Sequence, residues 1–106
     1  MTDNDLNLFV ARLNEWIYQH DKEQFPSLTR DEPYRKIVAE PGRKYIKLVV
    51  VSLAGDHRSV YCFLDRSGNI YKAASWRTPA KHIRGNITDE VVWGKALGPY
   101  GAAYMR

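Results

Sequence analysis

The stretch "YIKLVVVSLAGDHRSVYCFLDRSGNIYKA", residues 45–73, alternates runs of β-branched and aromatic residues with short segments rich in glycine, aspartate and serine. Such runs are typical of strands, and the segments between them are short enough to close hairpins. Gly68 lies in the second segment and can supply the positive φ that a tight turn requires. Upstream, "RKIVA" adds a β-rich run that ends at the turn residues Pro41 and Gly42. The pattern therefore predicts an antiparallel meander with strands near residues 35–39, 44–53, 59–64 and 69–73.

Alternation of side chains gives the predicted sheet two different faces. On the second strand, the apolar residues that point one way are Ile46, Leu48 and Val50. The residues that point the other way are Tyr45, Lys47, Val49 and Val51. On the third strand, the two faces receive Val60, Cys62 and Leu64 in alternation with Tyr61 and Phe63. One helix covers only one face, so the second, partly aromatic face either packs against the C-terminal third of the chain or stays open.

The N-terminal segment predicts an amphipathic helix that can cover the first face. Its apolar residues recur three and four positions apart: Leu6, Phe9, Val10, Leu13, Trp16 and Ile17. Thr2, Asp3 or Asn4 can cap its first turn. Pro26 sets the latest position at which the helix can end, and the polar residues 20–24 favour an earlier end.

Beyond the meander, Thr78 followed by Pro79 has the chemistry of a helix N-cap and first helical residue, and Gly85 that of a helix terminator. We therefore expect a short basic helix over residues 79–84. The backbone N–H groups at the start of such a helix would add an anion site.

The C-terminal part contributes less to the expected fold. Residues 87–93 are β-branched and can add another strand, and the glycine-rich tail 94–106 is expected to wrap on the surface or to stay mobile. The predicted fold class is α+β in a single domain, residues 1–106. It consists of an N-terminal amphipathic helix on a mainly antiparallel sheet of four to five strands, with the short basic helix after the meander.

The composition, with 44% hydrophobic and 26% charged residues, is that of an ordinary soluble globular protein. Cys62 is the only cysteine, so no intrachain disulfide can form, and we expect a buried thiol in a reducing compartment. The acidic N-terminus lacks the positive charge of a signal peptide, and no apolar run approaches the ~20 residues of a membrane span. We therefore expect a cytoplasmic protein with no membrane partner and no cofactor.

Charge is unevenly distributed along the chain, whose net charge is +4. Residues 1–33 hold three basic and seven acidic residues, a net charge of −4, whereas residues 34–106 hold thirteen basic and five acidic residues, a net charge of +8. This asymmetry makes the second part a candidate for contact with phosphate or with an acidic protein. It equally fits a helix and a sheet that carry opposite charges for mutual docking.

The chain holds no carboxylate from Arg66 to Arg84, and this basic run is the candidate binding surface. Several cations on one surface can bind phosphates, and aromatic rings among them can stack bases. The candidate nucleic-acid-binding residues are Arg66, Tyr71, Lys72, Trp76, Arg77, Lys81, His82 and Arg84. Cations of the preceding hairpins can extend the surface: Arg43, Lys44, Lys47 and Arg58.

Roles can be assigned within this set. The phosphate contacts are expected from Arg77, Lys81 and Arg84, with support from Lys72 and His82. Either Trp76 or Tyr71 would be the stacking ring. The alternative is that Trp76 belongs to the core and that the cations form an ordinary solvated surface.

The sequence gives little support to catalysis. His57 and His82, with Lys81 and Tyr71, could in principle form an acid–base pair for RNA cleavage, but two histidines far apart in sequence occur easily by chance. Cys62 lies in the middle of a predicted strand and is expected in the core rather than at a reactive site. No cluster has the spacing of metal ligands, and no phosphate-cradling loop is present. We expect a protein that is not an enzyme and that holds no metal.

Four segments, "GRKYIKLVVV", "SVYCFLD", "GNIYKAASW" and "PAKHIRGNI", carry a resemblance that covers residues 42–87. They resemble a set of small uncharacterised proteins encoded by tailed bacteriophages. The resemblance implies a phage product that acts in the bacterial cytoplasm, where small proteins often bind nucleic acid or host proteins. It implies no activity and no catalytic residues, and it does not extend to the N-terminal helix or the tail.

We therefore expect non-catalytic binding of nucleic acid, single-stranded or structured RNA or DNA, with little base specificity. The alternative is a protein-binding module that inhibits or redirects a host or phage protein, because Tyr, Trp and Arg also dominate protein interfaces. The two readings differ in their response to salt, since phosphate contacts weaken as salt rises.

Overall fold

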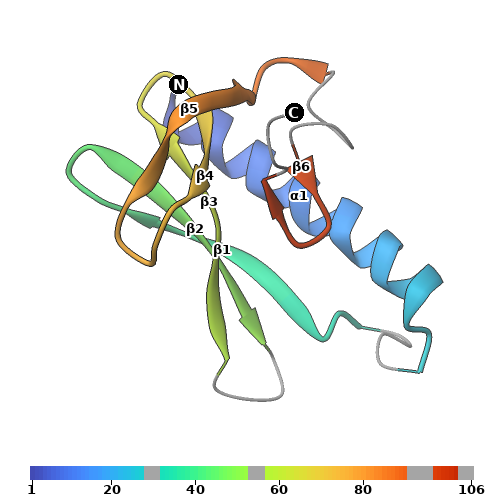
Figure 1. Cartoon of the computed structure of the whole chain (residues 1–106). Helices are drawn as coiled ribbons and strands as arrows, with labels where there is room; N and C mark the ends of the chain where they lie inside the picture. The colour runs from blue at the N-terminus through green and yellow to red at the C-terminus, as the bar shows by residue number, and fades with distance from the viewer. Residues whose placement is uncertain (28–31, 53–56, 91–96, 103–106) are drawn as a thin grey trace.

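The computed structural model describes residues 1–27, 32–52, 57–90 and 97–102 (Figure 1). One helix, α1 (Asp3–Gln24), crosses one face of a five-stranded antiparallel sheet, which confirms the α+β fold class. The strands follow one another in sequence order: β1 (Arg35–Pro41), β2 (Tyr45–Ser52), β3 (Arg58–Asp65), β4 (Asn69–Ala73) and β5 (Pro79–Asn86). A separate two-stranded hairpin consists of β6 (Leu97–Gly98) and β7 (Gly101–Ala102).

Helix α1 begins at a capping box. The Thr2 hydroxyl accepts a hydrogen bond from the Asp5 backbone N–H at 3.0 Å, and the Asp5 carboxylate accepts one from the Thr2 N–H at 2.9 Å. The helix ends at Gln24, within the polar residues 20–24 and before Pro26, as expected. The Asp21 carboxylate is buried against Arg35 and holds the last turns of the helix on the sheet.

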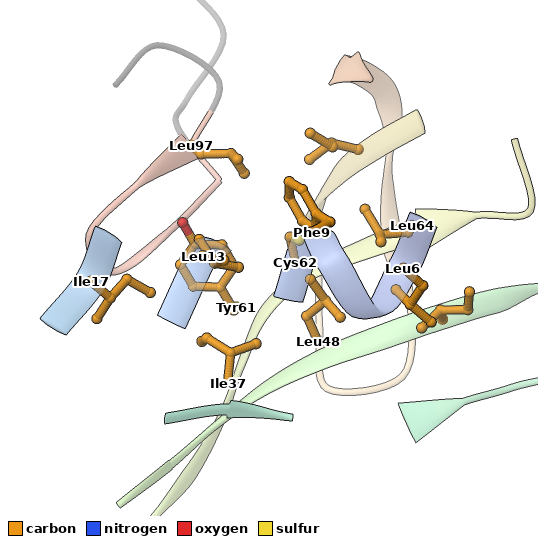
Figure 2. Close-up of a cluster of buried hydrophobic side chains, with 12 residues drawn as sticks. Leu6, Phe9, Leu13, Ile17, Ile37, Leu48, Tyr61, Cys62, Leu64 and Leu97 are labelled. Atoms are coloured by element: carbon orange, nitrogen blue, oxygen red, sulfur yellow. The ribbon is translucent and has the colours of Figure 1, made fainter. Parts of the chain in front are cut away.

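The core lies between α1 and the first face of the sheet (Figure 2). The helix contributes Leu6, Phe9, Leu13 and Ile17, and the sheet contributes Ile37, Ile46, Leu48, Tyr61, Cys62, Leu64 and Ile70. Each large apolar side chain buried here stabilises the fold by about 1.5–3 kcal/mol relative to its exposure to water. The periodicity of the helix and the alternation in β2 are thereby confirmed.

Strand β3 departs from simple alternation because it contains a bulge. Leu48 pairs with Cys62, but the next residue, Val49, pairs with Val60, so that Tyr61 is the extra residue. Both Tyr61 and Cys62 are therefore buried, and the expected alternation of Tyr61 with its neighbours is wrong. The Tyr61 hydroxyl donates to the Gly98 carbonyl oxygen, which ties the β6–β7 hairpin to the sheet.

The β6–β7 hairpin is part of the packed structure. Leu97 is fully buried in the core cluster (Figure 2), although it lies in the segment that we expected on the surface or mobile. The residues of the tail beyond 102 lie outside the described part of the chain.

The short basic helix expected over residues 79–84 is wrong, because these residues belong to β5. The Thr78 carbonyl oxygen accepts hydrogen bonds from Ala74 and Ser75, which closes a hairpin loop in front of the strand. Pro79 is tolerated because it is the first residue of an edge strand. A helix of six residues with one large apolar side chain could bury little, whereas a strand satisfies its backbone against β4. The anion site predicted at the start of this helix is therefore also wrong.

The strand expected over residues 87–93 is also misplaced. Residues 87–90 form a turn that follows β5, and residues 91–93 lie outside the described residues. The fifth strand of the sheet is β5 itself.

Candidate functional site

A groove lies on the second face of the sheet, the one that α1 does not cover. It has a volume of about 340 Å³. Its lining residues come from the end of β1, the β1–β2 turn, β2, β3 and the β4–β5 loop: Glu40, Pro41, Gly42, Arg43, Lys44, Tyr45, Lys47, Phe63 and Arg77. We call it the basic groove, because four of these side chains are cationic and one is acidic.

The β1–β2 turn fixes one wall of the basic groove. The Gly42 N–H donates to the Tyr45 carbonyl oxygen at 2.8 Å. A Cβ atom at Gly42 would lie 2.8 Å from that same oxygen, so the tight turn requires glycine. Arg66, in the β3–β4 turn, donates to the Gly42 carbonyl oxygen. Arg66 therefore supports the wall, and its guanidinium is engaged with backbone.

The loop between β4 and β5 contributes Arg77 to the groove. The Ser75 hydroxyl accepts hydrogen bonds from the backbone N–H groups of Arg77 at 3.3 Å and Thr78 at 3.1 Å. These bonds restrain the backbone on both sides of Trp76. Arg77 thereby joins the residues of the β1–β2 turn in the lining of the groove.

The floor of the groove is aromatic. The Tyr45 ring meets Phe63 edge to face, with centroids 6.3 Å apart, and meets Tyr71 in the same way at 5.6 Å. Phe63 is almost fully buried although it faces away from the helix-side core. These edge-to-face contacts hold the three rings as one rigid unit.

Tyr71 is anchored by a carboxylate. Its hydroxyl donates to Asp65 at 2.9 Å, and both desolvation and this hydrogen bond raise the pKa of Tyr71. Burial alone would raise the pKa of Asp65, but hydrogen bonds from Asn69, Tyr71 and Ser67 outweigh it and lower that pKa. Asp65 is therefore a charged acceptor that organises the β3–β4 turn.

Trp76 is exposed, which decides between the two readings of this residue. It is 43% exposed and directly precedes Arg77, which lines the groove. The Lys47 ammonium lies 4.0 Å from the centroid of its ring, and the Arg58 guanidinium carbon lies 5.9 Å from it. Arg58 also forms an ion pair with Glu40, the acidic residue of the groove lining. The negative charge in the groove is thereby balanced by a cation at its margin.

The structure brings together part of the predicted site. Arg77 and Trp76 lie with the four cations that were expected to extend the surface: Arg43, Lys44, Lys47 and Arg58. The contribution of Glu40 was not expected, because its neighbourhood arises from the pairing of β1 with β2. That pairing places it opposite Lys47.

Four predicted residues lie elsewhere. Lys72 lines a different pocket, together with Tyr61, Gly98 and Tyr100. The remaining three are on β5 and do not line the basic groove: Lys81, His82 and Arg84. Lys81 and His82 are exposed, whereas Arg84 is partly buried, and its Nε and Nη1 atoms have no hydrogen-bond partner among the described residues.

The structure gives no geometric support to an acid–base pair of His57 and His82. His57 precedes β3 and His82 lies in β5, and strand β4 runs between these two strands. Cys62 is fully buried, and burial raises the pKa of its thiol. In the described ranges, no group of three potential ligands is placed to hold a metal ion.

Within the described part of the chain, no helix is both long enough and apolar enough to cross a lipid bilayer. No curated protein and no solved structure matches the chain. One family model matches residues 3–97, most of the chain, and its description is "Family of unknown function (DUF7717)". The chain therefore belongs to the DUF7717 family.

Proposed function

We propose that this protein binds nucleic acid without catalysis, and that the basic groove is the binding surface. The observation that supports the proposal is the convergence of Arg43, Lys44 and Lys47 with Arg77 around an aromatic floor. These cations come from segments about thirty residues apart in the sequence, and Glu40, the one carboxylate in the lining, is paired with Arg58. The fold thus concentrates positive charge that the sequence leaves dispersed.

The mechanism is electrostatic. Each phosphate that a cation neutralises releases condensed counterions, which gives affinity that depends on salt and not on sequence. The charged side chains that the lining offers for contact are mainly cations, which bind the phosphates of any sequence, so little base specificity is expected. As part of the same proposal, the protein acts in the bacterial cytoplasm as a phage-type product.

The proposed phosphate contacts differ from those expected from sequence alone. Arg77 keeps its role, whereas Arg43, Lys44 and Lys47 replace Lys72 and Arg84. Lys81 and His82 are exposed on β5 and can contact a strand that extends beyond the groove.

The test is a fluorescence-anisotropy titration with labelled single-stranded RNA, single-stranded DNA and duplex DNA, between about 50 and 200 mM salt. Arg77→Gln should weaken binding and reduce the salt slope by about 0.7–0.9, the contribution of one phosphate. Lys22→Gln is the matched control, because it removes one exposed positive charge on α1 and should leave the slope unchanged.

Two outcomes would contradict the proposal. Wild-type protein that binds none of the three probes at the lowest salt overturns it and leaves a protein partner as the alternative. Equal effects of Arg77→Gln and Lys22→Gln would place the binding surface outside the basic groove.

A further inference from the structure

We infer that the basic groove selects single strands, that one base stacks on Trp76, and that Lys47 covers this ring until a phosphate draws it away. This inference rests on the proposed function and narrows it to one class of nucleic acid. It concerns the ring that receives the base and the cation that exchanges partners.

Trp76 is the ring in this region that is free to receive a base. The other three rings are engaged with one another, and Tyr71 is also bound to Asp65 through its hydroxyl. Phe63 is buried. Trp76, by contrast, is 43% exposed, and the ring contacts described for it are with the cations Lys47 and Arg58. Sequence alone left the choice between Trp76 and Tyr71 open.

The Lys47 side chain lies next to both the Trp76 ring and the groove. Its ammonium lies 4.0 Å from the indole centroid, and its side chain also lines the groove in which the phosphates are expected. A cation over an exposed aromatic ring is weakly held, whereas a phosphate offers a full negative charge and accepts hydrogen bonds. A phosphate in the groove therefore draws the ammonium off the ring. The ring face that it leaves is apolar and flat.

This exchange favours single strands. In a duplex the bases are stacked on one another, so that the protein reaches phosphates and base edges but no base face. An unpaired base can lie flat on an indole, and stacking of this kind depends little on base identity. The cations contribute to both classes of ligand, and Trp76 contributes to the single strand alone.

The experiment compares labelled oligothymidine with a duplex of equal length. Trp76→Leu should weaken oligothymidine binding by about 5- to 150-fold and change duplex binding by less than about twofold. Trp76→Phe keeps an aromatic face and should retain part of the single-strand affinity. An abasic oligomer with the same backbone should bind wild-type protein as weakly as oligothymidine binds Trp76→Leu.

Fluorescence and salt dependence test the two roles separately. Oligothymidine should quench the emission of wild-type protein but not of Trp76→Phe, which retains the other two tryptophans as background. Lys47→Met should lower the salt slope for oligothymidine by about 0.7. An unchanged slope in Lys47→Met overturns the transfer of Lys47 to phosphate.

Failure of this inference is distinguishable from failure of the proposed function. If wild-type protein binds both probes and Trp76→Leu weakens both equally or neither, the stacking role is overturned while nucleic-acid binding stands. If wild-type protein binds neither probe, both are overturned. Thermal unfolding of each variant checks that the fold is intact, and the Phe variant provides the comparison where Leu disturbs the loop.

Discussion

At the scale of single residues, the buried pair of Asp21 and Arg35 should be highly sensitive to mutation. Asp21 is 1% exposed and Arg35 9%, and the guanidinium donates two hydrogen bonds of 2.8 Å to the carboxylate. Burial would lower the pKa of Arg35, but the hydrogen bonds and charge of Asp21 outweigh it and raise that pKa. The rings of Tyr34 and Tyr100 flank the guanidinium, so that almost no water reaches the pair.

Asp21→Ala should destabilise the protein by about 3–5 kcal/mol, because it leaves Arg35 charged and buried without its partner. The double variant Asp21→Leu with Arg35→Met should recover most of this loss, since both charges and their desolvation are removed together. Urea unfolding of wild type, Asp21→Leu, Arg35→Met and the double variant gives the coupling energy. A loss of less than about 1 kcal/mol in Asp21→Ala would mean that the pair is hydrated in solution.

At the scale of secondary-structure elements, α1 protects the edge of the sheet that β1 forms. The Asn14 side-chain amide donates to the Ile37 carbonyl oxygen at 3.0 Å, and its oxygen accepts from the Ile37 N–H at 2.7 Å. The amide thus occupies the Ile37 backbone groups, which a further strand would use. An unpaired strand edge is a template for association between chains, so this contact both docks the helix and blocks the edge.

Asn14→Ala should therefore cost about 1–3 kcal/mol, because it leaves a backbone donor and acceptor of β1 unsatisfied in a partly buried position. Asn7→Ala is the control, since Asn7 is exposed on the same helix. Chemical denaturation measures the difference in stability, and hydrogen exchange at Ile37 reports the local effect. If the two variants have the same stability and the same exchange rate at Ile37, Asn14 does not have this role.

Some secondary-structure elements can be predicted from the local sequence, and others cannot. The helix and four strands follow from side-chain periodicity, because burial on one face imposes that period on the residues themselves. The prediction of a helix at β5 is wrong because Thr78, Pro79 and Gly85 carry local helix-end signals, whereas the strand conformation depends on pairing with β4. The Tyr61 bulge likewise has no local signature, since it is defined by the register against β2.

The same distinction applies to the candidate site. Arg77 and Trp76 could be selected from an acid-free, aromatic run, but their neighbours depend on how the β4–β5 loop lies over β2. Lys72 was grouped with them by sequence proximity and lies in a different pocket. No local sequence signal selects Glu40, because its position at the groove arises from the pairing of β1 with β2.

At the scale of the whole molecule, several carboxylates make the folded state sensitive to acid. Hydrogen bonds from Arg12 lower the pKa of Glu90 and join α1 to the turn after β5. Backbone and side-chain hydrogen bonds to Thr2 lower the pKa of Asp5. The pKa of Asp65 is lowered as well. In each case the folded protein holds the charged form more strongly than the unfolded chain does, so acid favours unfolding.

The sign of the pH dependence follows from Asp65. Because its pKa is lower in the folded protein than the ordinary value of 3.8, protons bind the unfolded chain first as the pH falls. The stabilisation is complete above the unfolded pKa and is lost as the pH falls through the folded pKa. The midpoint temperature of thermal unfolding should therefore decrease as the pH is lowered from about 5 to about 2. Asp65→Asn should be less stable than wild type near neutral pH, and this difference should narrow as acid is added.

Glu23→Gln serves as the comparison, since it removes an exposed carboxylate from the last turns of α1. Its difference from wild type should stay small and nearly constant over the same range, because that carboxylate accepts none of the hydrogen bonds described here. Thermal unfolding followed by circular dichroism gives both differences at each pH. A constant difference between Asp65→Asn and wild type would show that the Asp65 charge adds nothing to stability. The β3–β4 turn would then be held by contacts that an amide reproduces.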